Sequence, residues 1–213
     1  MSVLKPIRFT VAIDGPAAAG KGTVAKGLAE HFGFAHLDTG LLYRAVAAKA
    51  LLGEDAITAA TQLSPSDITP HTLRSPDVAQ MASKVAVIPQ VRAALVAFQK
   101  SFSCQDGGTV LDGRDIGTTI CPEADIKIFI TASAGIRAKR RYDELQNNGL
   151  KTSYEEVLRH VKERDERDMT RKDAPLKAAK DAYVLDTSSL SIVMSLQQAI
   201  DITSEAFGKL SKS

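Results

Sequence analysis

A loop bounded by glycines decides the fold of this chain: Gly15-Pro16-Ala17-Ala18-Ala19-Gly20-Lys21-Gly22-Thr23. An apolar run over residues 9–13 precedes the loop, and a helical pattern over residues 21–32 follows it. A strand, a glycine-bounded loop, a lysine, a hydroxyl and a helix in this order are typical of a phosphate-binding loop, or P-loop. Backbone N–H groups and the positive end of the helix attract phosphate oxygens there. We therefore expect the whole loop to bind ATP, with Lys21 on the β- and γ-phosphates and Thr23 on Mg²⁺. The spacing disfavours the alternative, a glycine-rich loop with a surface lysine.

The rest of the chain alternates between strand and helix patterns. Apolar runs predict strands at residues 9–14, 35–37, 109–112, 126–130 and 183–186. Helical spacing, caps and Pro at first turns predict helices at residues 21–32, 41–52, 76–87, 89–102, 133–146, 191–207, and from 153 into the charged stretch 162–173. This alternation predicts an α/β fold with a five-stranded parallel sheet flanked by helices. Residues 54–72 have weak periodicity and two prolines, and we expect a loop there with one short helix.

We expect a single domain over residues 1–213, built from a core and two smaller parts. The core covers about residues 3–53, 103–163 and 176–213. An insert spans about residues 54–102, and a short arginine-rich lid spans about residues 164–175. The length suits one sizeable domain with such inserted parts.

Polar residues follow the strand ends where ligands of parallel sheets bind. Four such residues lie at the carboxyl end of a predicted strand or directly after it: Gly15, Asp38, Asp112 and Asp186. Ligands of parallel sheets bind beyond these strand ends. We expect the first three to surround one cleft. Asp112 follows an apolar strand, as a Walker B-type carboxylate does, and could hold Mg²⁺ through water. A carboxylate that merely stabilises a turn is the alternative for Asp112.

Arginines are the second chemical signal, because the planar guanidinium binds phosphate through two hydrogen bonds. Arg44 lies six residues after Asp38, and Arg114 lies just beyond the third strand with Asp115 beside it. Two groups at helical spacing could face a nucleotide: Arg164, Arg167 and Arg171, and Arg137, Arg140 and Arg141. Salt bridges to Asp165 and Asp168 are the alternative for the first group, and simple solvation is the alternative for the second. Beside a P-loop, we interpret the first group as a lid that excludes water.

Composition excludes several other classes. The net charge is +2, too small to indicate nucleic-acid binding by itself. Two cysteines without a CxxC motif, and four scattered histidines, indicate neither a disulfide framework nor a structural zinc site. No apolar run is long enough to span a membrane, and residues 1–8 lack the apolar segment of a signal peptide. We expect a cytoplasmic monomer with small-molecule partners, no nucleic acid and no membrane, and ordinary packing or surface roles for the histidines.

Several separate blocks together resemble the bacterial cytidylate kinases, within the nucleoside monophosphate kinases. The resemblance extends over about residues 10–207. The blocks are residues 13–23 with Gly-Lys-Gly-Thr, 37–40 with Tyr43 and Arg44, 82–86 with residues 91–92, 111–118 with Asp-Gly-Arg-Asp, and 164–168 with residues 171–176. The Asp-Gly-Arg-Asp and Arg-Asp-x-Arg-Asp blocks are much more specific than the P-loop. The Gly-Phe-Pro-Arg block usual in adenylate kinases is absent.

The resemblance implies a role for each matching position. Ser83, Arg92 and Asp115 look like the group that reads cytosine, whose amino edge and O2 and N3 acceptors suit these side chains. Arg44, Arg114 and Arg171 look like clamps on the acceptor phosphate. Arg164 and Asp168 look like sugar contacts, with Thr39 and Tyr43 beside them on the CMP side, whereas Arg137, Arg141 and Arg167 are expected on the ATP side. Many relatives have a longer insert with a small β-sheet. Here the stretch between Leu52 and Val78 is short and lacks clear strand alternation, so we expect a reduced or mostly helical lobe.

The resemblance thus implies a (d)CMP kinase of pyrimidine metabolism, which transfers the γ-phosphoryl group of Mg·ATP to CMP or dCMP. Lys21, Arg114 and Arg171 would carry the catalytic charge stabilisation. Two alternatives stay open. One is a kinase of another small acceptor, such as UMP, AMP or a metabolite hydroxyl. The other is a nucleotide-dependent switch, although the Asn-Lys-x-Asp block often found in that class is absent.

Overall fold

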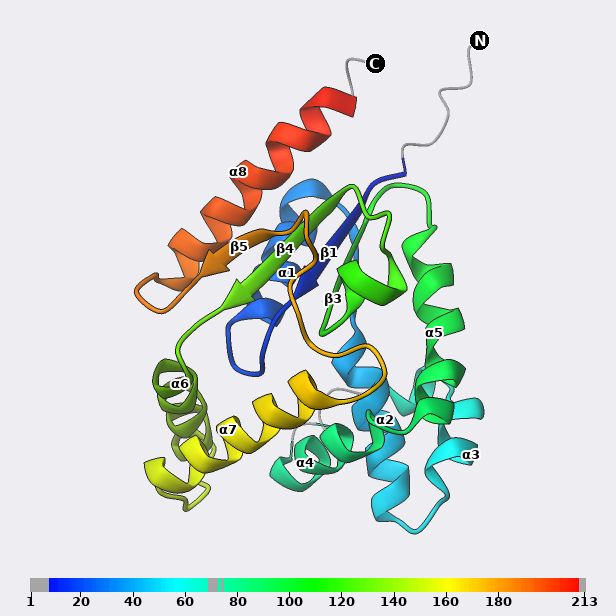
Figure 1. The fold of residues 1–213 in the computed structure, drawn as a ribbon, viewed down its shortest axis with the longest axis vertical. Coiled ribbons are helices and arrows are strands. Elements are labelled where there is room, and N and C mark those ends of the chain that lie inside the picture. Colours follow the sequence, from blue (N-terminus) through cyan, green and yellow to red (C-terminus); the bar gives the residue numbers. More distant parts are fainter. Residues whose placement is uncertain (1–7, 69–72, 74, 211–213) are drawn as a thin grey trace.

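A parallel sheet forms the centre of the molecule in the computed structural model, which describes residues 8–68, 73 and 75–210 (Figure 1). Within this part of the chain the sheet has the order β2-β3-β1-β4-β5, and every neighbouring pair is parallel. Its strands are β1 (Thr10–Asp14), β2 (Ala35–Asp38), β3 (Thr109–Gly113), β4 (Ile126–Thr131) and β5 (Tyr183–Asp186). The predicted five-stranded parallel sheet is therefore confirmed.

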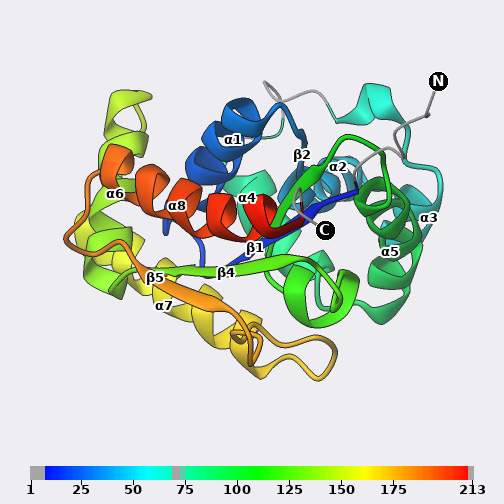
Figure 2. The same ribbon diagram turned by 90° about the horizontal axis from the view of Figure 1, so that it is seen from above.

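Two layers cover the sheet. Helices α1 (Lys21–Phe32) and α8 (Ile192–Leu210) lie together on one face, as Figure 2 shows. Alternate side chains of β1, including Val11 and Ile13, are fully buried against that layer. Ala12 points to the opposite face, where Leu111 of β3, α5 (Pro89–Ser103) and a π-helical turn (Ile116–Ile120) pack together. Strands buried on both faces explain the continuous apolar runs.

A helical lobe, residues 39–103, stands beside the sheet. It contains α2 (Thr39–Leu51), α3 (Ala56–Thr61), a 3₁₀ turn (Pro65–Asp67), α4 (Pro76–Val85) and α5. Ten buried apolar residues, from Leu42 to Leu95, form a core of its own. The described part of residues 54–102 has no strand, so the expectation of a mostly helical lobe is confirmed. Residues 69–72 and 74, which fall in the predicted loop, lie outside the described residues.

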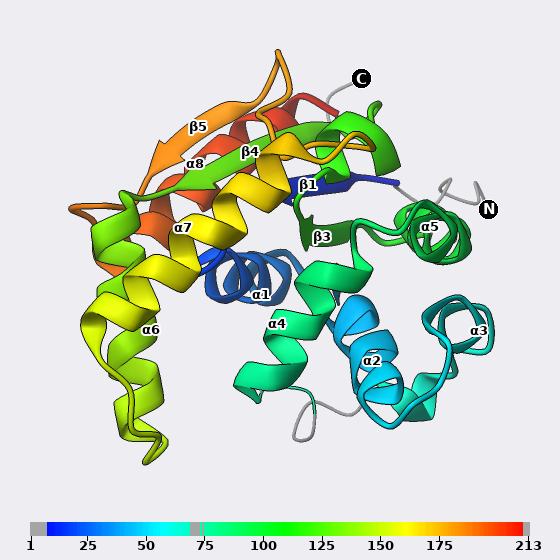
Figure 3. The ribbon, with the colours of Figure 1, turned by 60° about the horizontal axis from the view of Figure 1, so that its bottom comes forward.

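Helices α6 (Ala134–Asn147) and α7 (Tyr154–Thr170) form a pair on the other side of the P-loop from α4, as Figure 3 shows. The predicted caps are present, because the hydroxyls of Ser133 and Ser153 accept the N–H groups of Ile136 and Glu156. Helix α7 extends into the charged stretch and ends at Thr170. The arginines of this stretch are thereby fixed along one helix and the turn after it.

The predicted elements agree with the structure apart from the ends of strands and helices and two short turns; the 3₁₀ turn Pro65–Asp67 is one of them. The π-helical turn Ile116–Ile120 was not predicted. Among the described helices, none is by itself long and apolar enough to span a membrane, although α4 and α5 together, bent by 98°, satisfy the length and composition criteria. Both helices bury apolar side chains in the core of the lobe.

Candidate active site

The P-loop connects the central strand β1 to α1 in a conformation that demands glycine. Gly15 has φ +147°, and a Cβ there would lie 1.9 Å from the carbonyl oxygen of Ile130. Gly20 and Ala18 also have positive φ, of 92° and 60°. No side chain caps the N-terminus of α1. The first backbone N–H groups of α1 are therefore available to an anion at the positive end of the helix.

Lys21 is buried at the base of this loop. Its Nζ donates to the carbonyl oxygen of Pro16 at 2.8 Å, and its side chain is enclosed although no carboxylate forms an ion pair with it among the described residues. Burial lowers the pKa of Lys21 to about 7, with repulsion from Arg114 and Arg164 acting in the same direction. A buried ammonium without a counter-ion is costly, so this position favours a bound anion.

One cavity, of about 660 Å³, collects most of the predicted site residues. It lies at the carboxyl ends of the strands, between the P-loop, the helical lobe and α6–α7. Its walls include Ala17, Ala18, Gly20, Lys21, Gly22, Thr23, Thr39, Tyr43, Arg44, Ser83, Arg92, Asp112, Arg114, Asp115, Arg141, Arg164, Arg167, Asp168 and Arg171. Four predicted residues are not among its walls: Gly15, Pro16, Ala19 and Arg137. The first three belong to the P-loop itself but do not face the cavity.

Cations crowd this cavity. Burial lowers the pKa of Arg164, and Arg114, Arg44 and Arg141 lower it further. The pKa of Arg44 is lowered by burial, with Arg141 and Arg114 contributing. Arg164 Nε is buried and has no hydrogen-bond partner among the described residues. Mutual repulsion between positive groups in one enclosed space indicates a site built for a polyanion.

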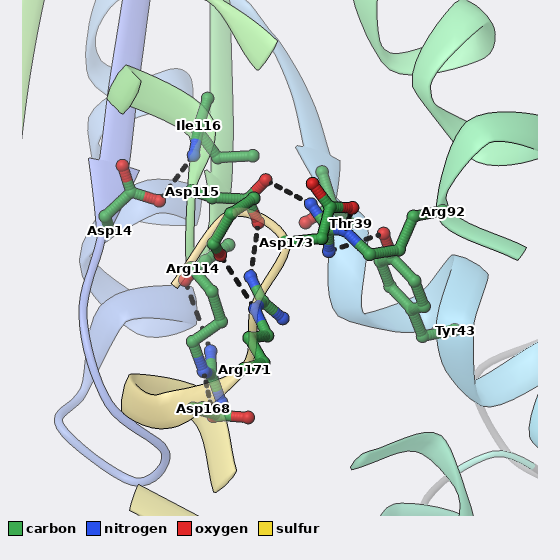
Figure 4. A network of polar contacts seen from close by, with 12 residues as sticks. Asp14, Thr39, Tyr43, Arg92, Arg114, Asp115, Ile116, Asp168, Arg171 and Asp173 are labelled. Atoms are coloured by element: carbon green, nitrogen blue, oxygen red, sulfur yellow. Dashed lines mark hydrogen bonds and ion pairs between the residues drawn. The ribbon is translucent and has the colours of Figure 1, made fainter. Parts of the chain in front are cut away.

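A polar network connects the helical lobe to the end of α7 (Figure 4). Asp115 lies at its centre and is buried: one carboxylate oxygen accepts from Arg92 at 2.5 Å, and the other accepts from Arg171 at 3.0 Å. Arg92 also donates to Tyr43 Oη at 3.3 Å and to Asp173 at 2.9 Å. Arg92, an expected cytosine reader, and Arg171, an expected phosphate clamp, thus bind the same carboxylate, that of Asp115.

A second ion pair joins the third strand to α7. Arg114 Nε donates to Asp168 at 2.9 Å, whereas Arg164 lies 3.9 Å from the same oxygen. Burial would raise the pKa of Asp168, but Arg114 and Arg164 outweigh it and hold the pKa below its ordinary value. The local salt bridges considered for this stretch are therefore secondary, because the shortest contact of Asp168 reaches another element. Arg114 is held at the cavity wall as a result.

Ser83 is a polar group without a protein partner. The side chain lies on α4, is 3% exposed and lines the cavity. Its hydroxyl makes no hydrogen bond within the described residues. A buried hydroxyl without a partner costs free energy, so its position in the cavity wall suits a ligand that supplies the missing hydrogen bond.

Oxygen ligands suitable for Mg²⁺ occur at the ends of β2 and β3. Asp38 and Asp112 both line the cavity with Thr23. Burial raises the pKa of Asp38, and the nearby Asp112 raises it further. Two neighbouring carboxylates and a hydroxyl fit Mg²⁺, which prefers one or two carboxylates with waters and phosphates. The described residues contain no group of three or more His, Cys, Asp or Glu side chains that could hold a metal alone.

Arg137 has a different environment from the one predicted. Its guanidinium donates to both carboxylate oxygens of Asp165 on α7, at 2.9 and 2.5 Å, and to the carbonyls of Ala132 and Ala17. These protein contacts keep it behind the P-loop instead of in the cavity wall. Arg140 likewise donates to the loop after β5, at Thr187. Of this arginine group, Arg141 alone lines the cavity.

Three acidic or basic residues that bond to site residues or to the elements beside the site were given no site role by sequence reasoning: Asp14, His36 and Asp173. The carboxylate of Asp14 accepts the N–H groups of Ile116 and Gly117, both at 2.7 Å, and ties the strand before the P-loop to the π-helical turn (Figure 4). Burial raises its pKa to about 6. His36, expected to have an ordinary role, contacts Asp112 at 2.8 Å. Asp173 binds Arg92 from 81 residues away in sequence. Asp186, in contrast, is exposed and bonds to Ser188.

A P-loop at the end of a central parallel strand, facing a cavity walled by arginines, defines the class of P-loop kinases. Solved structures agree at the level of the fold. A gluconokinase from Sinorhizobium meliloti 1021 is similar at a TM-score of 0.52 and 13% identity, covering 98% of this chain and 99% of its own. A protein from Eubacterium ventriosum is similar at a TM-score of 0.56 and 15% identity, covering 91% of this chain and 96% of its own.

The chain belongs to the cytidylate kinase family, whose sequence profile it matches over residues 11–205. It is 56% identical to a cytidylate kinase of Cereibacter sphaeroides over 195 residues, which cover 92% of this chain and 95% of that relative. It is 53% identical to one of Methylocella silvestris, covering 94% of this chain and 96% of the relative. For one of Agrobacterium fabrum the identity is 50%, with 93% and 98% covered.

Proposed function

We propose that this protein transfers the γ-phosphoryl group of ATP to CMP or dCMP, giving ADP and CDP or dCDP, in pyrimidine nucleotide metabolism. Family membership supports the reaction. The observation that carries the proposal is the crowding of Lys21, Arg44, Arg114 and Arg164 around one cavity. Arg114 lowers the pKa of each of the other three, and Arg164 and Arg44 lower those of Lys21 and Arg164 in turn. Two phosphate groups that meet end to end would supply the missing negative charge.

The donor side consists of the P-loop, Gly15–Thr23. Its backbone N–H groups hold the phosphates of ATP, and Lys21 leaves the Pro16 carbonyl to follow the charge that develops on the transferred group. Arg141 and Arg167 approach the donor from α6 and α7. We propose that Arg137 contributes to this side as well, by holding the carbonyl of Ala17 and therefore the loop.

The acceptor base lies between the helical lobe and the third strand. Ser83, Arg92 and Asp115 read cytosine, whose O2 and N3 accept hydrogen bonds and whose amino group donates them. The unpartnered hydroxyl of Ser83 supports this assignment. Thr39, Tyr43, Arg164 and Asp168 contact the sugar, and Arg44, Arg114 and Arg171 clamp the acceptor phosphate.

The reaction needs no general base. The second phosphate pKa is about 6, so the attacking oxygen of the acceptor is already an anion near neutral pH. The arginines bring this oxygen into line with the γ-phosphorus and neutralise the repulsion between the two phosphate groups. A lid of about residues 164–175 closes over them and excludes water, which would otherwise compete as acceptor.

Mg²⁺ is the proposed cofactor. Thr23 would hold it directly and Asp112 through water, and the ion would neutralise charge on the donor phosphates when bound. We also propose that the protein is a cytoplasmic monomer, with neither nucleic acid nor membrane as partner. The modest net charge of +2 supports the exclusion of nucleic acid.

A panel of acceptors tests the function. Purified protein is mixed with Mg·ATP and CMP, dCMP, UMP or AMP in turn, and ADP release is followed by a coupled assay. We expect turnover with CMP and dCMP well above the rate with UMP or AMP. Preferred turnover of another acceptor would overturn the base assignment. Slow ATP hydrolysis that no acceptor stimulates would favour a nucleotide-dependent switch.

A further inference from the structure

Asp173 is an acidic residue of the turn after α7 that contacts the base-reading arginine. Its carboxylate accepts a hydrogen bond from Arg92 Nε at 2.9 Å (Figure 4). The two side chains have opposite exposure: that of Arg92 is 3% exposed, whereas that of Asp173 is 54% exposed. An exposed carboxylate, that of Asp173, therefore accepts a hydrogen bond from the buried guanidinium of Arg92.

The hydrogen bonds of Arg92 leave a defined set of donors for a ligand. A guanidinium has five N–H groups, and three of those on Arg92 have protein acceptors: Nε bonds to Asp173, one terminal nitrogen to Asp115, and the other to Tyr43. Each terminal nitrogen keeps one N–H without an acceptor among the described residues. These two N–H groups remain available to acceptors that a ligand supplies, such as O2 and N3 of cytosine.

Asp173 also belongs to the segment that carries a phosphate clamp. Arg171 lies two residues before it, donates to the second oxygen of Asp115 at 3.0 Å, and donates through Nε to the carbonyl of Ala174 at 2.7 Å. Arg92 and Arg171 are thus joined twice, through Asp115 and through the chain from Arg171 to Asp173. When this segment is in place, the base reader and the phosphate clamp are aligned together.

We infer that Asp173 is a positioning residue for acceptor recognition, which fixes the guanidinium of Arg92 and makes base reading depend on the placement of the Arg171–Asp173 segment. This inference rests on the proposed function. Asp173 does not touch the substrate; it acts through Arg92. Removing its charge leaves the guanidinium of Arg92 held by Asp115 and Tyr43 alone. Its orientation is then less fixed before CMP binds, and ordering it on binding costs entropy.

The variant Asp173→Asn tests the inference by steady-state kinetics. A hydrogen bond to a charged group is lost or weakened, so we expect KM for CMP to rise about fivefold to tenfold. The KM for ATP and the thermal unfolding midpoint should stay close to the wild-type values. Asp181→Asn is the matched control, because Asp181 is another exposed carboxylate paired with a buried cation, Lys127 at 2.7 Å, and it does not line the cavity. That variant should keep the wild-type KM for CMP.

A double-mutant cycle separates positioning from a general structural effect. Arg92→Lys keeps the charge but has no Nε–H fork, so Asp173→Asn should add little to KM for CMP in that background. Equal increases in KM for both substrates, or full additivity of the two changes, would overturn the inference. So would an unchanged KM for CMP in Asp173→Asn while the wild type phosphorylates CMP. If the wild type does not phosphorylate CMP, the proposed function is wrong, and this result is distinct from a failure of the inference about Asp173.

Discussion

Replacing Lys21 by Met should stabilise the empty protein while it abolishes most of the turnover. Burial lowers the pKa of Lys21 from 10.5 to about 7. Between these two values the unfolded chain binds a proton that the folded chain lacks, so the free energy of unfolding of the wild type rises as the pH rises through this window. Below it, the folded chain keeps a desolvated ammonium that Met does not have.

The magnitude follows from the shift. One pKa unit corresponds to 1.36 kcal/mol, so the ammonium costs the folded state at most about 5 kcal/mol below the window. Met keeps the apolar stem but loses the hydrogen bond to Pro16, which offsets roughly 1.5–3 kcal/mol of that gain. We expect Lys21→Met to be more stable than the wild type by about 2 kcal/mol near pH 6.5, and the advantage to disappear near pH 9.5.

Urea unfolding followed by circular dichroism, at both pH values, measures this difference. Turnover with ATP and CMP is measured in parallel, and it should fall by at least about 100-fold. Lys127→Met is the control, because the ammonium of Lys127 has a carboxylate partner in Asp181 and its removal should give no gain near the lower pH. A Lys21→Met protein less stable than the wild type near pH 6.5, or equally stabilised at both pH values, would refute the reasoning.

Three further substitutions test the other parts of the site. Arg171→Met should give a folded protein by circular dichroism with turnover reduced at least about 100-fold, and wild-type turnover would contradict its role as a clamp. Ser83→Ala should raise KM for CMP about twofold to tenfold without lowering the unfolding midpoint, because the hydroxyl has no protein partner to lose; an unchanged KM would remove Ser83 from base reading. Asp112→Asn should raise the Mg²⁺ concentration for half-maximal turnover about tenfold or more in a magnesium titration at saturating nucleotides, and an unchanged midpoint would separate Asp112 from the metal.

Local patterns were sufficient to predict most of the fold. The apolar runs predicted every strand of the described sheet, and the capping serines before α6 and α7 marked where these helices begin. These features depend on neighbours in sequence, which is why they could be read from it. The π-helical turn Ile116–Ile120 could not, because its first N–H groups are held by Asp14, about a hundred residues earlier.

The sequence predicted most residues of the candidate site, but it did not predict which carboxylate forms an ion pair with which arginine. The place of Arg114 after the third strand and the helical spacing of Arg171 predicted these two residues, and the resemblance to the cytidylate kinases added Asp168. The structure collects all three around one cavity. The sequence could not show that Arg137 pairs with Asp165 behind the P-loop, or that Asp173 reaches Arg92. Which carboxylate meets which arginine depends on where α7 lies relative to the P-loop and the helical lobe. A useful signal was nevertheless present, since Asp14 and Asp173 each lie within two residues of a predicted site residue.

The separate apolar core of the helical lobe bears on how such an enzyme can diverge. Leu42, Val46 and Val91 pack among themselves and their helical neighbours, away from the layer between the sheet and α1. A change of side-chain volume in the lobe core therefore falls first on the helices of the lobe and not on the layer between the sheet and α1. Over evolutionary time, insertions and repacking in the lobe can alter which small molecule is accepted, while the machinery that grips the nucleotide triphosphate is inherited without modification.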